Sequence, residues 1–264
     1  MAIISPKKAQ NEAIDIINRV ITEKRNISEF ENARIISHLD SLHRARSESY
    51  DEISACYYSQ IADVDNLLKS VDSVFSSHSN DGMLNVIYAL NNAMRYKEIY
   101  KYIKKHKLYF DSRSFIETAV KAGAFCGDHE LSKEYMDIYI SNFDDDHAVE
   151  FSSHVGEVND FFLENKKNKE ALSSYLIECF DVFSRFSLIK TKEVDGAYGY
   201  SHHVFNDEGY NFLAFSFILH QDESDFDKII EIEDDFLNRI ACIECESIIK
   251  TKIAFNFEVG YPHD

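Results

Sequence analysis

A chain of 264 residues, of which 45% are hydrophobic and 28% charged, is long enough to bury a core without disulfides. Its formal net charge of −18 argues against direct binding of nucleic acid, because Lys and Arg hold phosphate backbones. The five cysteines are scattered, and the sequence shows no signal peptide and no apolar run of bilayer length. We therefore expect a cytoplasmic protein that does not use a membrane, and we also expect no cofactor.

The first segments carry helix-start signals in a chain with only two prolines and eight glycines. Ser5 stands before Pro6, the residue best tolerated in the first turn of a helix. Ser28 and Glu31 form a capping-box pattern ahead of a second apolar periodicity. We expect these two helices to pack as a hairpin, followed by helices over about 48–62 and 64–77. The predicted fold class is mainly α.

Residues 83–143 read as helical hairpins in series. Ala89 matches Ala122, and Tyr102 matches Tyr135, with the same separation in each pair. This pattern resembles the tetratricopeptide-type repeat, although the early Trp and the closing Pro of that family are missing. The resemblance implies antiparallel helical hairpins stacked in series and no particular binding residues. A looser unit is expected over 158–183.

After residue 185 the pattern changes, which predicts one region over 1–185 and a second over 186–264. The stretch "IIKTKIAFNFEVG" alternates apolar and polar residues, so a strand is predicted over 249–259. Its partners could be 187–194 and 210–220, although 210–220 could equally be a buried helix. The segment 225–245 has the spacing of an acidic amphipathic helix, and 196–210 is a glycine-rich connector.

Several polar motifs have simple structural explanations. The acidic run 144–150 suits the N-terminus of a helix, and the lysines between 95 and 107 suit a solvated helix face. Cys242 and Cys245 form a lone C-x-x-C that we interpret as two core thiols on a helix. Connectors often carry binding residues, so an enzyme with a metal site at His202, His203 and His220 is a third hypothesis.

The acidic concentration in the C-terminal region carries the first functional hypothesis. Eight carboxylates stand within fourteen residues: Asp222, Glu223, Asp225, Asp227, Glu231, Glu233, Asp234 and Asp235. Such a patch suits a non-enzymatic protein that docks on a basic partner. In charge and class, although in no motif, the chain is similar to immunity or antitoxin proteins that occlude nuclease-type toxins. The second hypothesis is a helical-repeat scaffold or regulatory subunit that holds a peptide at Asn92, Tyr96 and Tyr135.

Overall fold

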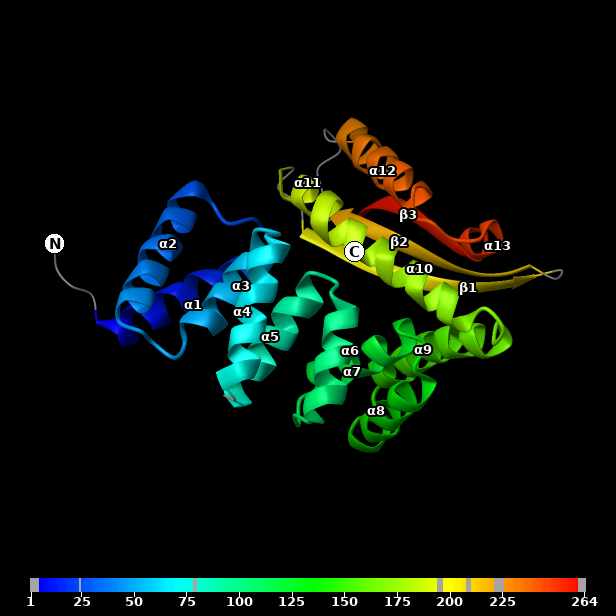
Figure 1. The fold of residues 1–264 in the computed structure, drawn as a ribbon, viewed down its shortest axis with the longest axis horizontal. Coiled ribbons are helices and arrows are strands. Elements are labelled where there is room, and N and C mark those ends of the chain that lie inside the picture. Colours follow the sequence, from blue (N-terminus) through cyan, green and yellow to red (C-terminus); the bar gives the residue numbers. More distant parts are fainter. Residues whose placement is uncertain are drawn as a thin grey trace. The chain divides into compact units, whose positions relative to one another are not determined.

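The computed structural model describes residues 5–23, 25–77, 80–193, 197–207, 210–220 and 226–260, and Figure 1 shows its helices and strands. The chain forms two compact units. The first contains Met1–Ala93 with Leu188–Ala197, and the second contains Met94–Ser187 with Tyr198–Asp264. The predicted division into 1–185 and 186–264 differs from this grouping and stays a prediction. Helices dominate the chain and a small sheet lies in its C-terminal part, which confirms the predicted fold class.

Helices make up the described part of the first unit. They are α1 (Pro6–Thr22), α2 (Glu29–Arg44), α3 (Tyr50–Gln60), α4 (Val64–Ser77), α5 (Asn80–Asn92) and α11 (Leu188–Glu193). The capping box is present, because the Ser28 side chain accepts from the Glu31 N–H and the Glu31 carboxylate accepts from the Ser28 N–H. α1 packs against α2, which confirms the predicted hairpin, and small and branched aliphatic residues fill the core around them.

The second unit begins with a run of helices: α6 (Tyr96–His106), α7 (Arg113–Phe125), α8 (His129–Asn142), α9 (Asp146–Glu164) and α10 (Lys169–Val182). α7 and α8 pack closely at Gly123, where an added Cβ would lie 2.6 Å from the backbone nitrogen of Ser132. The turn between them uses Gly127 at a φ of 68°, and Met94 has a φ of 53° before α6. A left-handed residue of this kind ends one helix and lets the chain reverse into the next.

The acidic run before α9 acts as predicted. Asp145 caps the helix by accepting a 2.9 Å hydrogen bond from the Ala148 N–H, and Arg113 holds the same carboxylate at 2.5 Å. The hydrogen bond from Arg113, followed by that from Ala148, lowers the pKa of Asp145 to about 2. The carboxylate therefore serves a helix end, and a bound ion is not needed to explain it.

Three strands follow α10 and the short π-helix η1 (Phe183–Ser187): β1 (Ala197–Asp207), β2 (Tyr210–His220) and β3 (Ile253–Gly260). They lie in the order β1-β2-β3, as Figure 1 shows. Only two residues separate β1 from β2, so these neighbours are antiparallel. β2 and β3 are parallel, and the chain between them contains α12 (Phe226–Ala241) and α13 (Ser247–Lys250). Parallel pairing requires such a crossover.

Three sequence expectations about this part of the chain need correction. The glycine-rich connector predicted over 196–210 is mostly strand, because Ala197–Asp207 forms β1. The stretch 187–194 was a candidate strand, but it contains α11, and the predicted strand over 249–259 begins only at Ile253. Ile249 lies in α13, where it is buried on a helical turn. The open question over 210–220 is answered as strand. Strict alternation therefore identified the core of β3 but extended it into the preceding turn of helix.

Alternate residues of the sheet form an aromatic face. Phe215 and Phe217 on β2 are fully buried, and Phe217 stacks on Phe183 of η1 at a ring distance of 4.0 Å. Phe236 of α12 packs edge-on against the same Phe217 ring at 5.5 Å. α10, η1 and α12 therefore cover one face of the sheet. None of the helices in the described ranges is long and apolar enough to cross a bilayer.

Candidate functional site

The predicted acidic patch is divided by the structure. Asp222, Glu223 and Asp225 lie outside the described residues. Glu233 accepts a 3.2 Å hydrogen bond from the Phe257 N–H, so its carboxylate pairs with a backbone group of β3. Asp235 forms an ion pair with Arg239 at 2.9 Å, one helical turn away. These two carboxylates therefore have structural roles within the fold.

The outward side of α12 carries the rest of the patch. Asp227, Glu231 and Asp234 are exposed, and their spacing places them on the side of the helix opposite the buried Ile229, Ile232, Phe236 and Ile240. Two apolar side chains border them, Ile230 at 41% exposure and Leu237 at 36%. We call these five exposed residues the α12 stripe. Carboxylates beside exposed aliphatic groups suit a surface that is both basic and partly apolar.

Two of the three residues predicted for a peptide groove are buried instead. Tyr96 is 1% exposed, packs against Phe125 at 4.9 Å, and shares a 2.6 Å hydrogen bond with the Tyr200 hydroxyl. Tyr135 donates to the carbonyl of Leu108, and burial raises its pKa to about 12. Both rings therefore fill the core of the second unit, while Asn92 belongs to the first unit.

The predicted histidines occupy different environments. His202 is buried, with Nε2 3.3 Å from the carbonyl oxygen of His154, and burial lowers its pKa to about 4. His203 is exposed, as expected for adjacent residues of a strand. His220 is the last residue of β2. Among the described residues, no group of three or more His, Cys, Asp or Glu is placed to hold a metal ion.

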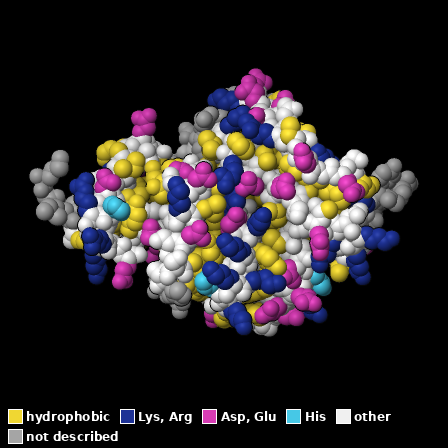
Figure 2. Space-filling model, viewed as in Figure 1, with side chains coloured by type: hydrophobic (Ala, Val, Ile, Leu, Met, Phe, Trp, Pro, Cys, Tyr) yellow, Lys and Arg dark blue, Asp and Glu magenta, His cyan; other side chains and the backbone are white. Residues whose placement is uncertain are grey.

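The lysines of α6 form the solvated face that the sequence predicted. Lys97, Lys101, Lys104 and Lys105 are exposed, while Ile99 and Ile103 are buried. Figure 2 shows Lys and Arg side chains gathered in this part of the surface. Lys104 pairs with Asp128 at 2.8 Å. At least one of these lysines therefore binds an acidic group of the protein itself.

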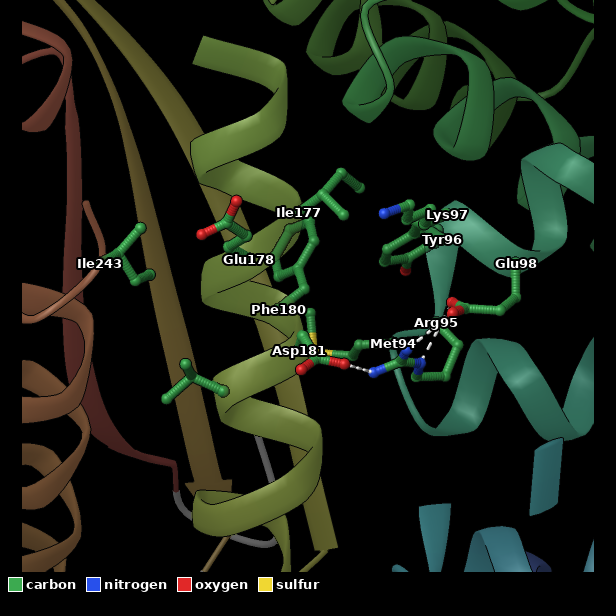
Figure 3. Close-up of a pocket in the computed structure, with 11 residues that line it drawn as sticks. Met94, Arg95, Tyr96, Lys97, Glu98, Ile177, Glu178, Phe180, Asp181 and Ile243 are labelled. Atoms are coloured by element: carbon green, nitrogen blue, oxygen red, sulfur yellow. Dashed lines mark hydrogen bonds and ion pairs between the residues drawn. The ribbon is translucent and has the colours of Figure 1, made fainter. Parts of the chain in front are cut away.

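Arg95 differs from these lysines, because it is only 7% exposed at the start of α6. Glu98 holds its guanidinium through two hydrogen bonds of 2.7 and 3.1 Å, and Asp181 of α10 binds the Nη1 atom (Figure 3). Ser184 accepts from the same nitrogen at 3.1 Å. Burial alone would raise the pKa of Asp181, but Arg95 and Arg185 together outweigh burial and lower that pKa. The sequence did not distinguish this arginine from its neighbours.

A cleft of about 320 Å³ opens beside this ion pair. Figure 3 shows that the residues around it come from the start of α6, from α10, and from Ile243 after α12. A second hollow of about 410 Å³ continues along α10 and shares Glu178 and Ile243 with the first. We call the two together the α10 groove. Sequence reasoning missed it, because its walls are far apart in the chain.

One of the two C-x-x-C cysteines, Cys245, lines this groove. The interpretation of both cysteines as core thiols on a helix is wrong. α12 ends at Ala241, so both cysteines follow the helix. Cys242 is exposed, and Cys245 is half-buried and lines the second hollow. Burial raises the pKa of Cys245. The helical pattern was extrapolated one turn beyond the true end of α12.

Comparison with protein-family models, with curated proteins and with solved structures finds no match.

Proposed function

We propose that this chain is a non-enzymatic protein that binds a basic partner protein through the α12 stripe. The observation that carries the proposal is the exposure of Asp227, Glu231 and Asp234 next to Ile230 and Leu237. Carboxylates at a docking surface attract a basic partner over distances of about 10 Å at about 0.1 M salt. The neighbouring aliphatic side chains then supply apolar contact area once the surfaces meet.

The overall charge supports the same proposal. With a net charge of −18, the whole chain draws a cationic partner toward it and repels polyanions. The finer proposal is that the chain is an immunity or antitoxin-type inhibitor. Such a protein would cover the basic active surface of a nuclease-type toxin, so that nucleic acid could no longer reach it. Its action would be occlusion, with no chemistry at the interface.

The test begins with the partner. The protein is used as bait in extracts of its native cells, and captured proteins are purified. Each is then titrated against the protein at about 50 mM and at about 300 mM salt, because the Debye length falls more than about twofold between these concentrations. The key variant is Glu231→Lys with Asp234→Lys. We expect a basic protein whose affinity falls at least about tenfold with salt and again with the variant.

A matched control tests whether the site or only the total charge matters. Glu134→Lys with Asp137→Lys makes the same charge change at the same spacing on exposed positions of α8. Its expected effect is less than about threefold, since those residues lie on another helix. Equal losses in the two variants would contradict docking at α12. A purified partner that keeps its full nuclease activity when bound would contradict the inhibitor proposal alone.

A further inference from the structure

The α10 groove has an acidic middle. Glu178 of α10 and Glu244 and Glu246 of the segment after α12 line it, and all three are exposed. Within the described residues, no ion pair engages any of them, whereas Glu98 and Asp181 at one end are held by Arg95. Lys97 and Lys167 stand at opposite ends. The carboxylates available to a ligand are therefore in the centre.

The floor of the groove combines polar and apolar side chains. Ala171, Ser174 and Glu178 follow one exposed stripe of α10, and the half-buried Ile177 and Ile243 contribute apolar surface. From Ala171 to Asp181 the helix rises about 15 Å at 1.5 Å per residue. This length matches four or five residues of extended chain at about 3.3 Å each.

We propose that the α10 groove binds a short extended segment of a basic protein, with Lys or Arg side chains at Glu178, Glu244 and Glu246 and apolar side chains on the floor. The inference rests on the proposed function in one respect, the basic partner, but it concerns a different surface. It predicts a partner that contributes both a folded basic surface, for α12, and a basic extended segment. Charge complementarity selects this occupant over an acidic or purely apolar one.

The experiment uses the full chain and three labelled synthetic peptides. One alternates lysine and isoleucine, one replaces each isoleucine by glycine, and one replaces each lysine by glutamate. Fluorescence anisotropy measures binding to the wild type and to two double variants, Glu178→Lys with Glu244→Lys, and Glu231→Lys with Asp234→Lys. We expect the first peptide to bind best. The groove variant should weaken it at least about tenfold, and the α12 variant less than about threefold.

Cys245 supplies a local readout, because it lines the groove and Cys242 does not. In a Cys242→Ser variant, bound lysine-isoleucine peptide should slow maleimide labelling of Cys245 at least about threefold. In a Cys245→Ser variant, labelling of Cys242 should be unchanged.

Any one of three results would overturn the groove proposal. They are an equal loss of peptide affinity in both double variants, equal affinity for all three peptides, or a rate of Cys245 labelling that bound peptide does not change. Each would leave the proposed function intact, since that depends on partner binding at α12. Unchanged partner binding in the α12 variant, with peptide binding as expected, would in turn overturn the proposed function and leave the groove proposal intact.

Discussion

The two faces of the three-stranded sheet are made from alternating residues of the same strands, yet they differ in almost every physical respect. On one face, Phe215 and Phe217 are fully buried under α10, η1 and α12. On the other, Phe205 is 48% exposed and stacks on Phe212. Adjacent residues such as His202 and His203 therefore have opposite environments. The difference shows that strand periodicity creates two faces, and that the packed helices decide which one becomes core.

The largest expected effect comes from removing a ring on the covered face. Phe217→Ala deletes a fully buried side chain that contacts Phe183, Phe236 and Phe257. We expect the free energy of unfolding to fall by about 4 kcal/mol, because the lost contacts leave a cavity that the rigid surroundings fill only in part. Urea unfolding followed by circular dichroism measures this.

The control is on the same strand. Phe212→Ala removes the same atoms from the opposite face, where the side chain is only half-buried, so the expected cost is about 1 kcal/mol. Similar losses for the two variants would contradict the distinction between the faces. A larger loss for Phe212→Ala would mean that the assignment of core and exposed face is reversed.

The second effect concerns pH. Because burial lowers the pKa of His202 from 6.5 to about 4, the unfolded chain takes up a proton between these values while the folded protein does not. Stability therefore falls as the pH decreases from 6.5 toward 4, and this loss levels off below pH 4. For one histidine it amounts to about 3 kcal/mol at most. His202→Phe should remove that part of the pH dependence.

The measurement is the free energy of unfolding at several pH values between 4 and 7 for wild type and variant. His203→Phe is the matched control, because that ring is exposed on the neighbouring position of β1. Its pH dependence should follow the wild type. If His203→Phe flattens the curve and His202→Phe does not, the buried histidine has been misassigned.

The helices could be predicted because their signals are local. Ser28 and Glu31 bond to each other's backbone within one turn, and the spacing of Ile99 and Ile103 depends only on the period of the helix. The end of α12 was missed, because Ile243 continues the apolar period one turn after the helix has stopped at Ala241. Periodicity records which residues face the core and does not mark where backbone hydrogen bonding ends.

The sheet and the groove depended on contacts that the sequence does not encode locally. The alternation of β3 predicted a strand, but its parallel partner β2 lies about 40 positions earlier, with Ser216 opposite Asn256. Arg95 is buried in an ion pair with Asp181 of α10, which lies far from it in the sequence. Of the candidate site, the sequence identified the α12 acids but could not show that Glu233 is used by the backbone of β3.

The smallest expected effect lies on the less covered face. Ser216 donates a 2.8 Å hydrogen bond to the Asn256 amide oxygen, and the Asn256 amide donates to Glu258 at 2.8 Å. Ser216→Ala and Asn256→Ala should each cost about 1 kcal/mol, and a double-mutant cycle should give a coupling of at least about 0.5 kcal/mol. Simple additivity would mean that this face is held together by its strands alone, because the cross-strand side-chain bond would then contribute nothing.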